Sequence, residues 1–213
     1  MMSAMPSSSP RRFARAGRAV VPAAAWLLSA ATPAELVTGT DADAQLPFWE
    51  WREPGMSLRL VQRLPDQSRA FFLARGFSRD DVELVARSCV FQTVFKNLST
   101  ADAPAAIDYD LRDWVVRSGA ETRGMKTRED WAETWARREV PKAARIAFEW
   151  ALFPTRQTYN AGDYNWGMSV FDLAPGDTFD LVLHWSQGGV RRTATLRGMR
   201  CAPDEDVATG EAP

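Results

Sequence analysis

"WGMSVFDLAPGDTFDLVLHWSQGGVRRTATLRGMRC", residues 166–201, is the stretch that decides the fold class. Its middle run places apolar residues at alternate positions, namely Phe179, Leu181, Leu183 and Trp185. A period of two is typical of a strand with one buried face. Turn residues stand on both sides of this run, "APGD" before it and "SQGG" after it. The stretch therefore predicts a hairpin followed by a third strand that ends near Cys201.

Two earlier segments show the same period. "CVFQTVFKN", residues 89–97, is rich in β-branched and aromatic residues, which favours a strand. "IDYDLRDWVV", residues 107–116, alternates cleanly until Asp113, where a bulge or a strand end is expected. The segment 144–153 fits both a strand and a helix, because its apolar residues match either spacing. Its length and aromatic content favour the strand.

Helices are predicted in two places. "PDQSRAFFLA", residues 65–74, begins with a proline at a tolerated first-turn position. Ser78 and Asp81 then begin a second short helix with the spacing of a capping box, which completes a helical hairpin over about 65–88. The segment 127–138 has the capping pair Thr127 and Asp130 ahead of two tryptophans on one helical face.

These patterns predict a mainly β protein, an antiparallel immunoglobulin-like β-sandwich with a helical hairpin before it and a helical insertion. An α+β fold is the alternative. We expect a leader over residues 1–44, one globular domain over 45–203 with its sandwich at about 89–201, and a disordered acidic tail over 204–213.

The leader has the composition of a secretory signal peptide. Four arginines precede the run "AVVPAAAWLLSAA", residues 19–31, which is too short to span a bilayer. Cleavage after Ala31 or after Ala44 would leave a mature chain without a membrane span. The sequence therefore predicts a periplasmic or secreted protein, and a disordered arm on a cytosolic protein is the alternative.

The two cysteines agree with export. Cys89 and Cys201 are the only ones in the chain, and an even number in an exported protein favours a disulfide. Such a bridge would join the strand predicted at residues 89–97 to the last predicted strand. The alternative is a pair of buried, reduced thiols that pack as small apolar side chains.

The composition disfavours several classes of function. The formal net charge is −1, so the chain lacks the basic excess of a protein that binds nucleic acid. His184 is the single histidine, which is too few for a blue-copper or catalytic zinc site. The motif of a hydrolase nucleophile elbow is also lacking. We predict no cofactor, and we leave enzymatic activity undecided but disfavoured.

Two cation sites are alternatives with weaker support. Met168, His184 and Met199 fall on the last three predicted strands, and their side chains would suit Cu(I) if they converged. Asn160, Asp163 and Asn165 supply oxygens within one short loop, as a calcium site does, but their spacing is not that of an EF-hand. A turn that uses these side chains to hold its own backbone explains the same residues.

The loop before the last strands is the best candidate for a recognition surface. Aromatic residues flanked by Asn, Gly and Asp tend to be exposed in loops, where binding residues are frequent. The candidate binding residues are Tyr159, Asn160, Asp163, Tyr164, Asn165 and Trp166. The sequence thus predicts a non-enzymatic accessory module that binds a protein of the cell envelope, with an unknown oligomeric state. The alternatives are a glycan-directed enzyme with a carboxylate pair drawn from Asp163, Asp172, Asp177 and Glu149, and a periplasmic Cu(I) carrier.

Overall fold

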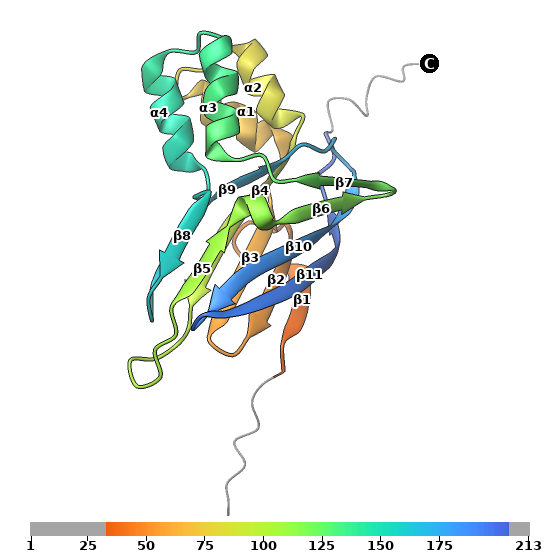
Figure 1. The fold of residues 1–213 in the computed structure, drawn as a ribbon. Helices are drawn as coiled ribbons and strands as arrows, with labels where there is room; N and C mark the ends of the chain where they lie inside the picture. Colours follow the sequence, from red (N-terminus) through yellow and green to blue (C-terminus); the bar gives the residue numbers. More distant parts are fainter. Residues whose placement is uncertain (1–32, 205–213) are drawn as a thin grey trace, which may run out of the picture. The chain divides into compact units, whose positions relative to one another are not determined.

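The computed structural model of the chain describes residues 33–204. Within that range the chain folds into two antiparallel sheets that face each other, and four helices gather at one end of them (Figure 1). The predicted mainly β sandwich with helices is therefore confirmed. None of the helices in residues 33–204 is long and apolar enough to cross a bilayer.

The first sheet, sheet A, has the strand order β1-β2-β3-β4-β9. Its strands are β1 Glu35–Thr40, β2 Pro47–Glu53, β3 Met56–Gln62, β4 Cys89–Asn97 and β9 Tyr164–Phe171. The strands up to β4 follow one another in both sequence and space. β9 returns from far along the chain to pair with β4, with Val94 opposite Trp166. β9 is therefore an edge strand of sheet A.

The second sheet, sheet B, is built around β10. On one side β10 pairs with β11, and on the other side its two halves pair with β6 and β5. β7 and β8 extend the sheet beyond β6 and β5. The strands are β5 Ile107–Asp110, β6 Val115–Ser118, β7 Glu121–Gly124, β8 Arg156–Tyr159, β10 Thr178–Gln187 and β11 Val190–Arg200. A turn of 3-10 helix, Leu111–Asp113, separates β5 from β6, which confirms the predicted strand end near Asp113.

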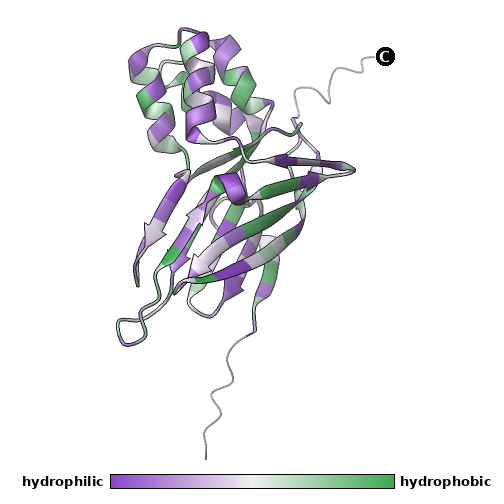
Figure 2. Cartoon of the chain, viewed as in Figure 1, coloured by the Kyte–Doolittle hydropathy of each residue, from purple (hydrophilic) through white to green (hydrophobic). Residues whose placement is uncertain are grey.

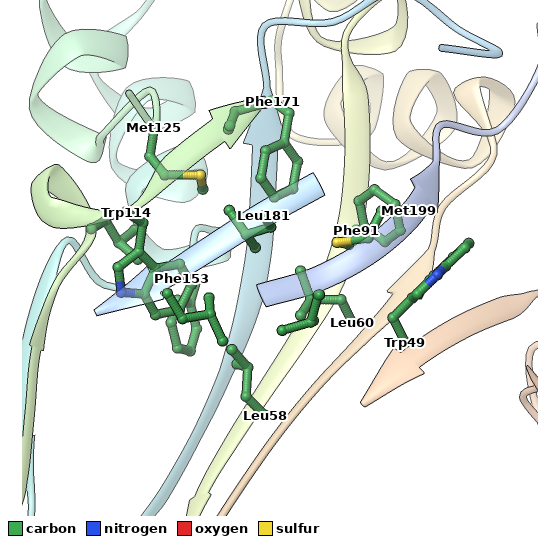
Figure 3. Close-up of a cluster of buried hydrophobic side chains, with 14 of the residues drawn as sticks. Trp49, Leu58, Leu60, Phe91, Trp114, Met125, Phe153, Phe171, Leu181 and Met199 are labelled. Carbon is green, nitrogen blue, oxygen red and sulfur yellow. The ribbon is translucent and has the colours of Figure 1, made fainter. Parts of the chain in front are cut away.

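The sandwich core lies between the two sheets. Alternate residues of each strand point inward, and hydrophobic and polar residues accordingly alternate along the strands (Figure 2). Phe91 of β4 contacts Phe171 of β9 and Phe179 of β10, so its ring joins both sheets. Figure 3 shows Phe91 and Leu60 of sheet A beside Met199 of sheet B in this cluster. Burial of this apolar surface is the main stabilising contribution to the sandwich.

The helices form a second core on the outer face of sheet A. They are α1 Pro65–Leu73, α2 Arg79–Ala86, α3 Arg128–Arg137 and α4 Lys142–Ala151. Their buried side chains pack on Val90 of β4 and on Met168 and Val170 of β9. Sheet A is thus covered on both faces where the helices lie. Trp131 and Trp135, the two tryptophans predicted to share one helical face, are both buried in this cluster.

Ser78 and Thr127 cap α2 and α3 as the sequence predicted. The Ser78 hydroxyl accepts a hydrogen bond from the backbone N–H of Asp81. At α3, the Thr127 hydroxyl and the Asp130 carboxylate satisfy each other's backbone N–H groups in a capping box. Each cap pairs backbone donors that the first helical turn would otherwise leave without a partner.

The disulfide between Cys89 and Cys201 is present and joins the two sheets. Cys89 is the first residue of β4 in sheet A, whereas Cys201 directly follows β11 of sheet B. The two residues are 112 positions apart in the sequence, and both are buried in the sandwich core. The bridge therefore closes a large loop across the interior.

Three predicted boundaries differ from the structure. β1 lies within the segment expected to be leader, so the folded domain begins well before residue 45; the remaining leader prediction, over residues 1–32, lies outside the described residues. The sandwich also begins before residue 89, and the helical hairpin is inserted between β3 and β4 instead of preceding the sheets. Asp204 belongs to the fold, because its carboxylate pairs with Arg69 of α1 at 2.7 Å. The rest of the predicted tail lies outside the described residues.

Two predicted elements are wrong. The segment 144–153 lies largely in a helix, α4, and not in a strand. The predicted hairpin around "APGD" does not form, because β9 belongs to sheet A and β10 to sheet B. The turn itself is present, with the Asp177 N–H donating to the Ala174 carbonyl at 3.2 Å. It passes the chain from one sheet to the other.

Candidate functional site

The exposed end of β9 carries the largest aromatic side chains on the surface of sheet A. Even-numbered residues of β9 point outward, where the helices cover Met168 and Val170. Tyr164 and Trp166 lie on the same outer face beyond the helices, and they are 67% and 61% exposed. We call these two residues the aromatic patch. Adjacent large aromatic side chains that are exposed to solvent are typical of surfaces that bind a partner.

The loop before β9 positions the patch through its own polar side chains. The Asp163 carboxylate accepts a hydrogen bond from the Asn160 backbone N–H at 2.8 Å. Gly162 has a positive φ of 81° within this turn. The buried Asn97 ties the turn to β4, because its N–H donates to the Asp163 carbonyl and its carbonyl accepts from Gly162. Asn160 and Asp163 thus have a structural role in the turn, and the Asn165 amide oxygen accepts from the Trp166 N–H.

Tyr159 is buried, and the expectation that it would be exposed with its neighbours is wrong. It is 1% exposed and stacks on Phe95 with ring centroids 4.6 Å apart. Burial raises the pKa of its hydroxyl to about 12. β8 ends at Tyr159, and an inward position at a strand end follows from the alternation with Thr158. The sequence-predicted loop therefore contributes only Tyr164 and Trp166 to an accessible surface.

Gly167, next to Trp166, allows the backbone of Leu152 and Phe153 to approach β9 closely. A Cβ atom on Gly167 would lie 2.5 Å from the backbone nitrogen of Phe153 and 2.7 Å from the Leu152 carbonyl carbon. The Phe153 N–H donates to the Met168 carbonyl at 2.8 Å, so this approach is part of the pairing at the edge of β9. Only a residue without a Cβ fits there.

We expect Gly167→Ala to lower the free energy of unfolding by about 1–3 kcal/mol, because the added methyl group meets backbone that is held by hydrogen bonds. Gly124→Ala is the matched control, since nothing lies within 4 Å of the corresponding Cβ position. Urea unfolding of both variants measures the difference. Equal midpoints for the two variants would show that the contact is easily relieved.

The outer face of sheet A next to α1 forms a groove of about 710 Å³. Its floor includes Val61 of β3 and Val94 of β4, and Phe71 of α1 is on its wall. We call it the α1 groove. Sequence reasoning missed it, because its residues come from four separate segments and each segment fits a partly exposed strand or helix by itself.

A second hollow lies on the outer face of sheet B and holds the single histidine. It has a volume of about 810 Å³ and is lined by polar residues of four strands. The His184 Nδ1 atom lies 3.0 Å from the Thr193 hydroxyl, while the Ser186 hydroxyl donates to Asp108 at 3.4 Å. Although a serine, a histidine and an aspartate share this face, these bonds do not link them in the order of a nucleophilic triad.

The three candidate copper ligands from the sequence do not converge. Met168 packs in the helical core, Met199 in the sandwich core, and His184 lies on the outer face of sheet B. Residues 33–204 contain no group of three or more His, Cys, Asp or Glu side chains placed to hold a metal ion.

The candidate glycosidase carboxylates also lie apart. Asp163 is in the β8–β9 turn, Asp172 and Asp177 are in the β9–β10 connection, and Glu149 is on α4. Asp177, like Asp163, accepts a hydrogen bond from the backbone of its own turn. Asp163 and Asp177 therefore stabilise their own turns.

Trp150 is the most exposed large apolar side chain of the described residues, at 82%. The strand predicted for residues 144–153 would have placed Trp150 on the same face as the buried Phe148, whereas the helix α4 separates them. In a helix Ala144 and Phe148 share the buried face, which turns Ile146 and Trp150 toward solvent.

No protein-family model, curated protein or solved structure matches this chain significantly.

Proposed function

We propose that this protein is an exported, non-enzymatic binding module that recognises a protein partner of the cell envelope through the aromatic patch. The exposure of Tyr164 and Trp166, side by side on one face of an edge strand, is the observation that supports it most. Tryptophan and tyrosine are the side chains that most often dominate the energy of protein interfaces.

Export is supported by the leader-like composition of residues 1–31 and by the disulfide. A buried bridge between Cys89 and Cys201 agrees with an oxidising compartment, where such bonds form and persist. These two observations support the proposal that the mature protein is periplasmic or secreted. An accessory role fits a chain of this size that displays apolar side chains beside a stable, disulfide-linked sandwich.

We expect the double variant Tyr164→Ala/Trp166→Ala to bind the partner at least about 30-fold more weakly, because truncation of one hot-spot aromatic costs about 2 kcal/mol or more. The tagged full-length protein is isolated from its own host under mild crosslinking. Proteins enriched with the wild type are identified by mass spectrometry and then titrated in purified form.

Val190→Ala is the matched control, because Val190 is 59% exposed but lies on sheet B. Both variants remove exposed apolar atoms, so thermal unfolding should be nearly unchanged. A partner that binds the double variant as tightly as the wild type would refute the role of the patch. The variant Trp150→Ala shows in the same assay whether the interface reaches α4.

A further inference from the structure

The aromatic patch continues directly into the α1 groove. Trp166 of β9 lies opposite Val94 of β4, and Val94 is part of the groove floor. Side chains opposite each other on one face of a sheet have Cβ atoms about 5 Å apart. Val94 in turn lies opposite Arg59 of β3. The two features therefore form one surface across β9, β4 and β3.

The groove contains one guanidinium whose charge is neutralised by neighbouring acids. Arg59 pairs with Asp41 at 2.7 Å and with Glu50 at 3.0 Å, and it stacks over the ring of Phe48. This arginine is thus fixed by groups within the fold. Because both carboxylates already neutralise its charge, Arg59 is a poor binding group for an acidic ligand.

Arg63, at the other end of the groove, differs from Arg59 because it has no such ion pairs among the described residues. It is half-buried, and no carboxylate of residues 33–204 forms an ion pair with it. Its Nε atom is buried without a hydrogen-bond partner. The guanidinium lies 5.4 Å from the ring centroid of Phe71, and Arg75 lies 3.3 Å from the same ring. Burial, and then the charge of Arg75, lowers the pKa of Arg63, which nevertheless stays charged at neutral pH.

A half-buried cation without an acid is costly, and an incoming carboxylate would relieve that cost. The surface of the groove is otherwise mainly apolar, and its larger hydrophobic residues are Leu46, Val61, Phe71 and Val94. Asp43 lies on the rim beside Asp41, at the end where Arg59 is already neutralised. A ligand with one acidic group is therefore drawn toward Arg63 and repelled from the opposite end.

The spacing suits an extended peptide. Arg63 lies two strands away from Trp166, and it lies four residues beyond Arg59, which is on the same row of the sheet as Trp166. With strands about 4.8 Å apart and a rise of about 3.3 Å per residue, the distance between the two backbones is roughly 16 Å. About five extended residues cover that distance.

We propose that the partner contributes an extended, mainly apolar segment that crosses the aromatic patch and places an acidic side chain or a C-terminal carboxylate on Arg63. This inference depends on the proposed function, since it names the chemistry of the partner at the same site. Tyr164 and Trp166 contact the apolar end of the segment, Val94 and Val61 contact its middle, and Arg63 pairs with its acid. A compact amphiphile would fill the groove but would not reach the patch.

The test is a selection of displayed random peptides of nine residues on the full-length protein. We expect enriched peptides to share an acidic residue, or a free C-terminus, about five residues from an aromatic or large aliphatic residue. Arg63→Glu should lower the affinity of a synthetic selected peptide at least tenfold and should select basic residues at the acidic position. Arg63→Gln is a milder variant that keeps the proposal testable if the charge reversal unfolds the protein. Arg197→Glu, an exposed arginine on sheet B, is the control and should change neither result.

The outcomes separate this inference from the proposed function. If peptides selected on the wild type depend on Trp166 but show no acidic preference and bind Arg63→Gln equally well, the peptide chemistry is wrong and the patch remains. No enrichment at all would overturn the peptide inference. Protection against thermal unfolding by dodecanoate that requires Arg63 and not Trp166 would identify an amphiphile as the occupant instead. Loss of a dimer in Arg63→Glu, measured by sedimentation, would identify a second copy of the chain and would also contradict it.

Discussion

Replacing both cysteines, in the variant Cys89→Ala/Cys201→Ala, should lower the free energy of unfolding by about 4–5 kcal/mol. The bridge closes a loop with a sequence separation of 112, and in the chain-entropy model a loop of that size gives this magnitude. For a domain of this size, each kcal/mol corresponds to about 2–4 °C in the melting temperature, so the midpoint should fall by about 10 °C or more. Urea unfolding followed by tryptophan fluorescence measures the change.

The reducing agent provides an internal control for this prediction. Wild-type protein unfolded in dithiothreitol should match the variant, while the variant should be insensitive to dithiothreitol. Both thiols are buried in the sandwich core, so the bridge of the folded protein should reduce slowly until the chain unfolds. Equal stability of the variant and the oxidised wild type would mean that the sheets hold the two chain ends together without the bridge.

The alternation of apolar residues predicted most of the strands, but it does not determine which strands pair. Phe179 and Leu181 identified β10 from its period alone, and the structure has them in the core. The partner of β9, by contrast, is β4, which is about 75 residues earlier in the chain. A turn with Pro175 and Gly176 reverses the chain equally well within one sheet or between two. Whether the turn joins strands of one sheet or of two depends on how the inner faces of both sheets pack together. A local sequence pattern carries no information about that packing.

The candidate site was predicted only in part, for a similar reason. Tyr164 and Trp166 stood out because aromatic residues next to Asn, Gly and Asp are unusual, and both are exposed. Tyr159 has the same neighbours in the sequence, but it still belongs to β8. There it alternates with the exposed Thr158, so its side chain points inward. Arg63 gave no signal in the sequence. It enters the proposal because no carboxylate of residues 33–204 forms an ion pair with it, and that is visible only once the fold has assigned Asp41 and Glu50 to Arg59.

The sequence of α4 fits both a strand and a helix, and its packing against neighbouring elements decides for the helix. Ile146, Phe148, Trp150 and Leu152 alternate as in a strand, but four alanines in "KAARIAFEWA" favour a helix. The buried residues are Ala144 and Phe148, which are spaced by one helical turn. Phe72 of α1 and the two tryptophans of α3 offer an apolar surface to that face. The alternation in this segment is therefore incidental, and it led to the wrong element.

Phe148→Ala should be the most damaging single substitution in the helical core, with a loss of about 3–5 kcal/mol in the free energy of unfolding. The Phe148 ring is 1% exposed and lies 4.8 Å from Phe72, 5.1 Å from Trp135 and 5.3 Å from Trp131, so it joins α4 to α1 and α3. Ile146→Ala on the same helix removes a side chain that is 45% exposed and should cost less than about 1 kcal/mol. If α4 were a strand, residues 146 and 148 would share one face and the two variants would be destabilised alike. Urea unfolding of both variants therefore tests the packing and the helical assignment together, because only a helix separates their effects.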